Sequence, residues 1–174
     1  IDRDKNKIND LKNGIITIYE PGLEEPVLKN YKNGRLRFST NLRNSVNKSD
    51  LIFICVGTPT KKNGKAADLS QVFDVTKEIS KSISRFKIII TKSTVPVTTG
   101  DKIEKIILKK KSHKLFSVVS NPAFLREGEA IRDFIYPDRV VLGTLNKISY
   151  KNLNKLLIVL SSKQIWLKKN IAML

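Results

Sequence analysis

The feature that most constrains the fold is an apolar run at residues 51–56, Leu-Ile-Phe-Ile-Cys-Val, which ends at Gly57-Thr58-Pro59-Thr60. A continuous apolar run of this length, closed by glycine and proline, is typical of a central parallel strand that is buried on both faces. Its exit presents Thr58 at the edge of the sheet where ligands bind. Cys55 lies inside the run with no histidine nearby, so we expect a packed thiol that carries no chemistry.

Strand and helix patterns alternate along the rest of the chain. Asp68 and Gln71 resemble a capping box, and apolar residues at helical spacing continue from there to about Ser84. We expect further strands at residues 35–40, 87–91, 115–119, 139–144 and 165–167, and further helices at residues 23–31, 42–47, 98–110, 129–134 and 148–161. This alternation predicts an α/β fold, with one incomplete, doubly wound and mostly parallel sheet.

Polar residues gather at two more strand exits. Lys92-Ser93-Thr94-Val95-Pro96-Val97 follows one predicted strand, and Ser120-Asn121-Pro122-Ala123-Phe124-Leu125-Arg126-Glu127-Gly128 follows the next. Open α/β sheets bind their ligands at the carboxyl ends of the strands, so these residues predict a ligand site. The alternative is that the second stretch is only a polar turn, with Arg126 and Glu127 in solvent.

Composition narrows the classes of function. The 33 basic and 16 acidic residues give a net charge of +17, but the lysines are scattered, and Lys109-Lys110-Lys111 has no interleaved aromatic residues to stack on bases. We expect a solvated basic surface and no specific nucleic-acid partner. His113 has no second ligand at zinc-like spacing, so no metal site is expected. The single cysteine and the short apolar runs predict a cytoplasmic protein with no disulfide and no membrane span.

Asp2 is a candidate ligand of a dinucleotide. If Ile1 closes a strand, Asp2 lies at the carboxyl end of that strand, where dinucleotide-binding folds keep an acidic residue for the adenosine ribose. The alternative is that Asp2 caps the helix that carries Ile8 and stops at Asn13-Gly14. The strand and GxGxxG turn that normally precede such an acid are missing from the sequence. We therefore expect a domain that is truncated at its start, and also at its end.

Seven motifs, in order along the chain, closely resemble the cofactor domain of the UDP-glucose 6-dehydrogenase family. They are Asp2 with Lys7, Ile18-Tyr19-Glu20-Pro21-Gly22-Leu23, Val56-Gly57-Thr58-Pro59, Ala67-Asp68-Leu69, Lys92-Ser93-Thr94-Val95-Pro96-Val97, Ser120 to Gly128, and Pro137-Asp138-Arg139-Val140-Val141. The resemblance covers about residues 1–145. The third-last and last motifs are more similar to the UDP-glucose branch than to the GDP-mannose or UDP-N-acetylmannosamine branches.

This resemblance implies a Rossmann-like NAD-binding domain. It implies a four-electron oxidation of UDP-glucose to UDP-glucuronate that consumes two NAD and one water, with the intermediate held on a cysteine. It also implies that the intact enzyme is a homo-oligomer. The residues implied are Asp2 for the adenosine ribose, Lys7, Thr58, Thr94 and Glu127 for the rest of the NAD site, Phe124, Leu125 and Arg126 for the nucleotide-sugar, and Thr94 again for the side of the hydrolytic water.

The chain departs from the family pattern in three places. The first strand with its GxGxxG turn is missing, as are the central helix, the catalytic Lys and Asn, and the UDP-binding second domain with the nucleophilic cysteine. We therefore expect residues 1–174 to be a partial NAD-binding domain that is inactive alone. Ala123 stands where the family has a glutamate, and losing a general base costs about 10²–10⁴-fold in rate.

Two alternatives remain open from the sequence. One is a non-catalytic remnant of a decaying nucleotide-sugar dehydrogenase gene, which Ala123 and the abundant lysine and asparagine favour. The other is a member of the GDP-mannose or UDP-N-acetylmannosamine branch. The nucleotide sequence on either side of this segment distinguishes an intact gene from a remnant.

Overall fold

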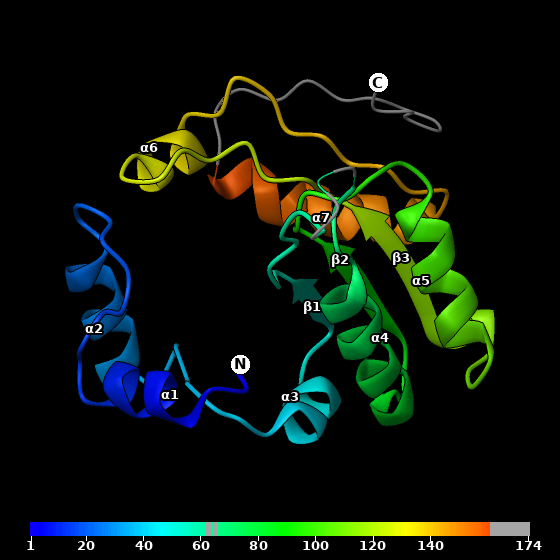
Figure 1. Cartoon of the computed structure of the whole chain (residues 1–174), viewed down its shortest axis with the longest axis horizontal. Coiled ribbons are helices and arrows are strands. Elements are labelled where there is room, and N and C mark those ends of the chain that lie inside the picture. Colours follow the sequence, from blue (N-terminus) through cyan, green and yellow to red (C-terminus); the bar gives the residue numbers. More distant parts are fainter. Residues whose placement is uncertain (62–63, 65, 161–174) are drawn as a thin grey trace.

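A computed structural model describes residues 1–61, 64 and 66–160 of the chain (Figure 1). Its elements, in order, are α1 (Lys5–Lys12), α2 (Glu24–Lys32), α3 (Leu42–Lys48), β1 (Leu51–Ile54), α4 (Ser70–Ser82), β2 (Lys87–Thr91), α5 (Thr99–Leu108), a 3-10 turn (His113–Leu115), β3 (Phe116–Ser120), α6 (Ala130–Ile135) and α7 (Lys147–Leu160). The three strands form one parallel sheet in the order β1-β2-β3. The predicted α/β fold is confirmed.

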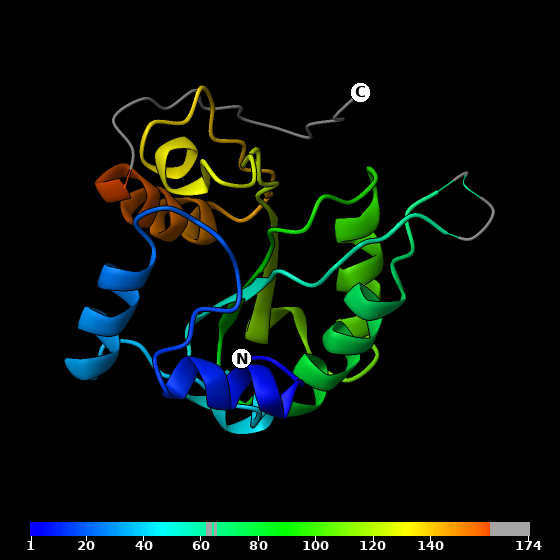
Figure 2. The ribbon, with the colours of Figure 1, turned by 60° about the vertical axis from the view of Figure 1, so that its left-hand side comes forward.

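The helices α1 and α2 are set apart from the sheet, and the loop between them reaches the start of α6 (Figure 1; Figure 2). α1 begins at Asp4, whose carboxylate accepts the N–H of Asn6 at 2.8 Å and that of Lys7 at 3.3 Å. It stops at Asn13, and Gly14 follows with a φ of +82°, a conformation that glycine adopts without strain. The predicted stop at Asn13-Gly14 is therefore confirmed.

The register of the sheet brings the ends of the three strands to one level. Ile54 of β1 lies opposite Thr91 of β2, and Thr91 lies opposite Ser120 of β3. All three strands run in the same direction, so the segments that follow these residues emerge side by side at the carboxyl edge of the sheet.

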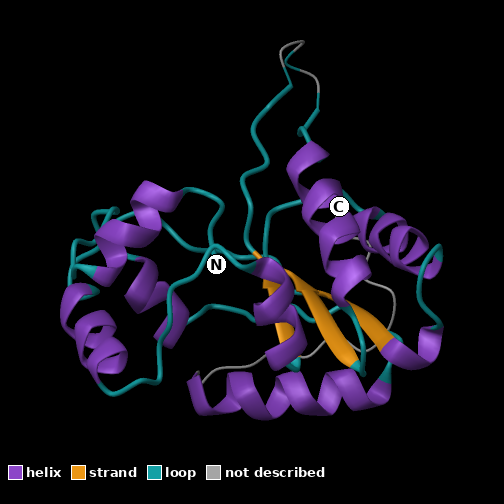
Figure 3. Ribbon diagram, turned by 90° about the horizontal axis from the view of Figure 1, so that it is seen from below, coloured by secondary structure: helices purple, strands orange, loops and turns teal. Residues whose placement is uncertain are grey.

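Helices cover both faces of the sheet (Figure 3). Ile89 of β2 packs with Ile79 of α4 and Ile103 of α5 on one face. Ile88 and Ile90 point the other way and pack with apolar residues of α7, Leu153 and Leu157. Burial of each of these side chains stabilises the fold by about 1.5–3 kcal/mol. Because successive residues of β2 pack against helices on opposite faces, the sheet is doubly wound, as predicted.

The central strand is β2, not the run at 51–56. Every residue of β2 is buried, whereas Phe53 of β1 is 39% exposed and Cys55 lies on the surface after the strand has ended. The predictions of a fully buried strand and of a packed Cys55 thiol are thus wrong. The reason is that β1, within the described residues, pairs with β2 alone and lies at the edge of the sheet.

Two predicted strands are absent from the described structure. The segment at residues 35–40 makes one backbone hydrogen bond to the start of the chain, from the N–H of Asp2 to the carbonyl of Ser39 at 3.3 Å. A single hydrogen bond does not form a β-ladder, and the segment is not a strand. At residues 139–144 a single antiparallel bridge joins Gly143 to Ser120 through two bonds of 2.9 Å. The predicted strand at 165–167 lies outside the described residues.

The predicted helices are all present, although one detail at the start of α4 differs from expectation. The carboxylate of Asp68 accepts the N–H of Ser70 at 2.9 Å, but the N-cap of α4 is Leu69, so Asp68 and Gln71 do not form a capping box. Lys87 is fully buried at the start of β2, where its ammonium donates to the carbonyls of Asn47 and Ser49 at the end of α3. Burial lowers the pKa of Lys87.

Within the described residues, none of the helices combines the length and the apolar character of a membrane span.

Thr98, before α5, has a φ of +72°, a left-handed conformation that costs a non-glycine residue about 1–2 kcal/mol. Its side chain makes no capping bond, so Thr98→Gly relieves this cost and loses only chain entropy, about 0.5–1 kcal/mol. We expect the melting temperature to rise by roughly 1–4 °C in a thermal scan. Thr99→Gly is the matched control, because Thr99 is helical and its hydroxyl donates to Pro96 at 2.7 Å. A lower melting temperature for Thr98→Gly contradicts the assignment of strain.

Candidate functional site

Three polar segments meet at the carboxyl edge of the sheet, as the sequence predicts. The N–H groups of Lys92 and Ser93 both donate to the carbonyl of Ile54, at 2.9 and 3.1 Å. The N–H of Asn121 donates to the carbonyl of Thr91 at 2.9 Å. Backbone hydrogen bonds therefore continue past the last residues of the strands and fix the three exits to one another.

The hydroxyl groups of the first two exits bind backbone carbonyls across the gap. Thr58 donates its hydroxyl to the carbonyl of Thr94 at 3.0 Å, and Ser93 donates to the carbonyl of Val56 at 2.7 Å. The side chain of Thr94 itself is exposed. The structure thus brings Thr58 and Thr94 together and leaves the hydroxyl of Thr94 open to a ligand.

Lys92 joins the second exit to the third. Its half-buried ammonium donates to Oδ1 of Asn121 at 3.2 Å, and the amide of Asn121 donates to the carbonyl of Val141 at 2.9 Å. Burial lowers the pKa of Lys92. Although Cys55 reaches the surface, desolvation by the surrounding chain raises its pKa, and the nearby Lys92 charge opposes this effect. Sequence reasoning did not assign Lys92 a role in the site.

The loop after β3 presents its apolar residues outward. Ala123 is half-buried and donates its N–H to the carbonyl of Lys92 at 3.3 Å. Phe124 is 49% exposed and Leu125 is 41% exposed. The guanidinium of Arg139 lies 5.5 Å from the centre of the Phe124 ring, within range of a cation–π contact. Phe124 and Leu125 form an accessible apolar wall beside the strand exits.

Arg126 is bound within its own segment. Its backbone N–H and its Nε donate to Oδ2 of Asp133 at 2.9 and 3.1 Å, and Nη2 donates to Oδ1 at 2.7 Å. Nη2 also lies 2.7 Å from Oε2 of Glu129. These donors lower the pKa of Asp133 to about 2, and the carboxylates raise the pKa of Arg126. The side chain of Arg126 is nevertheless 68% exposed and Glu127 is exposed too, so the alternative that both lie in solvent agrees with the structure, with Arg126 also held in an ion pair.

Asp2 and Lys7 form an ion pair of 2.9 Å at the start of the chain. The N–H of Asp4 and the ammonium of Lys7 lower the pKa of Asp2, which is therefore ionised at neutral pH. Asp4, not Asp2, is the N-cap of α1, so the alternative of Asp2 as a helix cap is wrong. Among the described residues no hydrogen bond or ion pair links this pair to Thr58, Thr94 or Glu127.

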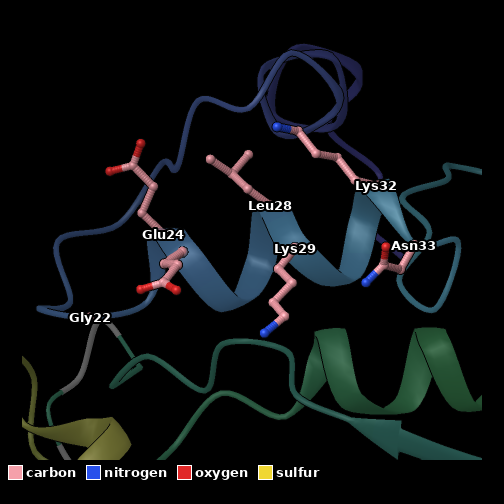
Figure 4. A pocket seen from close by; sticks show the side chains of 7 residues that line it. Gly22, Glu24, Leu28, Lys29, Lys32 and Asn33 are labelled. Atoms are coloured by element: carbon pink, nitrogen blue, oxygen red, sulfur yellow. The ribbon is translucent and has the colours of Figure 1, made fainter.

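Two hollows are lined in part by residues of the loop, and a third lies along α2. One, of about 600 Å³, is lined by the first turn of α5 together with Ser93, Ser120 and Pro122. Another, of about 660 Å³, is lined by Phe124, Arg126 and Arg139 among others. A third, also about 660 Å³, lies along α2 and is lined by residues 22–33 alone (Figure 4). The α2 hollow contains none of the predicted site residues.

His113 lies in the 3-10 turn before β3 and is among the residues that line the hollow of about 600 Å³. Its side chain is exposed and 3.4 Å from Glu104, as expected for a solvated histidine. In the described part of the chain no three His, Cys, Asp or Glu side chains converge to hold a metal ion.

Sequence reasoning missed Glu20, whose carboxylate accepts two backbone N–H groups at the far end of the loop, those of Gly128 and Ile131. It also missed the partner of Arg126, Asp133. The motif at residues 18–23 includes Glu20, but no local signal identifies its partners, because they are 108 and 111 residues away in the chain.

Comparison with known proteins identifies the family of the chain. Residues 1–159 match the family described as the UDP-glucose/GDP-mannose dehydrogenase family, NAD binding domain. The chain belongs to this family. The predicted resemblance is thereby confirmed, and the NAD cofactor is the one that the matched domain binds.

Curated relatives within the family are UDP-glucose 6-dehydrogenases. The chain is 48% identical over 143 residues to that of Rhizobium meliloti (strain 1021), covering 82% of this chain and 33% of the relative. It is 45% identical over 157 residues to YwqF of Bacillus subtilis (strain 168), covering 90% of this chain and 36% of the relative. The chain therefore spans about a third of the length of the curated relatives it matches.

Solved structures of the family share the fold. A UDP-glucose dehydrogenase from Pyrobaculum islandicum superposes with a TM-score of 0.88 at 33% identity, covering 95% of this chain and 39% of that one. A GDP-mannose dehydrogenase from Pseudomonas aeruginosa gives a TM-score of 0.89 at 34% identity, covering 99% and 40%. The two likenesses are so close that the fold comparison does not separate the branches.

The Arg126–Asp133 pair predicts an acid-sensitive loop. A carboxylate whose folded pKa is depressed stabilises the fold above its ordinary pKa, and this contribution is lost as the pH falls through the folded value, about 2. We expect an NMR titration of the Asp133 carboxyl carbon to have its midpoint at about 2, and Arg126→Gln to move it up toward 3.8. Arg43→Gln, on the exposed surface of α3, serves as the control and leaves the midpoint unchanged. A wild-type midpoint near 3.8 contradicts the pairing.

Proposed function

We propose that the chain is the NAD-binding part of an enzyme that oxidises UDP-glucose to UDP-glucuronate. The observation that carries the proposal is the meeting of Thr58, Thr94 and the loop at 121–128 on one edge of a parallel sheet. The identity of 48% to a UDP-glucose 6-dehydrogenase supports the choice of substrate. Because the chain spans about a third of such relatives, the complete reaction is a property of a longer protein.

The polar residues assigned to the NAD site, at the start of α1 and at the strand exits, fit a dinucleotide. The ionised carboxylate of Asp2 can accept hydrogen bonds from the hydroxyls of the adenosine ribose, with Lys7 beside it. The free hydroxyl of Thr94, held in place by Thr58, and the exposed carboxylate of Glu127 offer further polar groups to NAD. When bound, NAD supplies the acceptor for the hydride from the sugar alcohol.

The apolar wall suits the nucleotide-sugar. Phe124 and Leu125 expose their side chains beside the strand exits, where they can exclude water from the reacting carbon. Arg126, tied to Asp133, acts here by shaping the loop and presents its aliphatic chain. Ala123 supplies no acid or base, so Thr94 is the residue of this chain that we assign to the side of the hydrolytic water.

Two further properties belong to the same proposal. The intact enzyme forms a homo-oligomer in this proposal, because the family that the chain resembles does so. It acts in the cytoplasm, because a single cysteine, Cys55, is expected to stay reduced there. The remnant hypothesis rests on Ala123 alone among the residues of the site. It predicts a reading frame that is interrupted just upstream and downstream of this segment.

We expect the 174-residue chain, mixed with NAD and UDP-glucose, to produce no NADH absorbance. The reason is that the chain covers about a third of the relatives that perform the reaction. The R. meliloti relative, assayed in the same buffer, is the positive control. Appearance of NADH with the 174-residue chain overturns the expectation that these residues are inactive alone.

Thr94→Val removes the exposed hydroxyl and keeps the size of the side chain. If that hydroxyl binds NAD, the dissociation constant measured by calorimetry rises by about 3–10-fold, the value of one hydrogen bond. Thr40→Val is the matched control, because Thr40 is also exposed but precedes α3, away from the strand exits. Equal affinities of the two variants for NAD contradict the role of Thr94.

A further inference from the structure

Glu20 joins two parts of the chain that are distant in sequence. Its Oε2 accepts the N–H of Gly128 at 3.1 Å, and its Oε1 accepts the N–H of Ile131 at 3.1 Å. Gly128 ends the loop that begins at Asn121, and Ile131 lies in the first turn of α6. Donors at the start of a helix have no acceptor within the helix, so one carboxylate satisfies two groups that need an outside partner.

The turn that carries Glu20 is itself packed against α6. The N–H of Leu23 donates to the carbonyl of Glu20 at 3.1 Å and closes the turn. Gly22 has a φ of +79°, and a side chain there would lie 3.9 Å from Cδ1 of Ile131. Glu20 therefore reaches α6 from a tight turn that lies against it, and not from a freely moving loop (Figure 1; Figure 2).

Besides the backbone bonds of Asn121 and Ala123, side-chain hydrogen bonds fix the loop at 121–128 at three places in the described structure, and one of them comes from the segment between α1 and α2. At its start, Asn121 is bound to Lys92 and to Val141. Near its end, Arg126 is bound to Asp133, seven residues along the chain. Glu20 supplies the third contact, and it lies between α1 and α2. This contact ties the loop to the helices that follow Asp2.

We propose that Glu20 is a positioning residue that sets the loop at 121–128 against the N-terminal helices. In doing so it fixes the place of Phe124 and Leu125 relative to the segment that carries Asp2 and Lys7. What the loop binds rests on the proposed function, but the contact itself does not. Loss of the Glu20 carboxylate frees the end of the loop and leaves the sheet and its core unchanged.

The test compares Glu20→Gln with Glu25→Gln in the 174-residue chain. Both variants lose one negative charge, and Glu25 is exposed in the first turn of α2. Glutamine at position 20 keeps one acceptor oxygen but turns an NH₂ group toward a backbone N–H. We expect amide hydrogen exchange at Gly128 and Ile131 to become about tenfold faster in Glu20→Gln. Exchange in β2 and α5, and the melting temperature, stay as in the wild type and in Glu25→Gln.

A second measurement, the affinity for UDP-glucose, separates positioning from a general effect on stability. We expect binding by Glu20→Gln to be weaker by roughly fivefold, because the ordered loop is populated for less of the time. Unchanged exchange at Gly128 and Ile131, an equal rise in exchange across the whole sheet, or an unchanged affinity each overturns the inference. If the wild type shows no affinity for UDP-glucose, the exchange rates alone decide the role of Glu20, because the proposed function assigns the complete reaction to a longer protein and is tested separately through NAD.

Discussion

The pairing of β2 with both of its neighbours is the constraint on which the site depends. It places Ile54, Thr91 and Ser120 at one level, so the polar segments that follow them emerge together. The apolar core holds this register, because Ile89 faces α4 and α5 while Ile88 and Ile90 face α7. A slip of one residue would turn each isoleucine to the wrong face. The position of a polar site is thus decided by apolar packing on the two sides of one strand.

Local patterns were sufficient to predict the parts of the fold that this packing controls. The sequence predicts strands at 87–91 and 115–119, and it predicts that the polar clusters after them lie at one edge of the sheet. Both predictions are possible because each apolar run and the turn-forming residues that end it lie within a few residues of each other. Glu20 and Asp133 could not be found in this way. The partners of Glu20 are more than 100 residues away, and the seven-residue step from Arg126 to Asp133 crosses an irregular loop.

The mistaken strands show what periodicity measures. Val141 and Leu142 are buried, as an apolar pattern at 139–144 requires, but their segment meets β3 through one bridge at Gly143. Alternating or continuous apolar residues indicate that a segment is buried. A strand also needs a neighbouring segment whose backbone N–H and C=O groups can pair with its own. The same distinction explains Phe53. The apolar run at 51–56 predicts full burial of Phe53, yet Phe53 is 39% exposed, because β1 pairs on one side alone within the described residues.

The charges around the strand exits point to recognition by hydrogen bonds and apolar contact. Arg126 is neutralised by Asp133 and Glu129, and the ammonium of Lys92 is committed to Asn121. These two cations are therefore not free to bind a polyanion. What faces outward is the hydroxyl of Thr94 and the rings and chains of Phe124 and Leu125. Such a surface suits the hydroxyls and flat faces of a sugar and a ribose, whereas a nucleic-acid backbone needs a row of free cations.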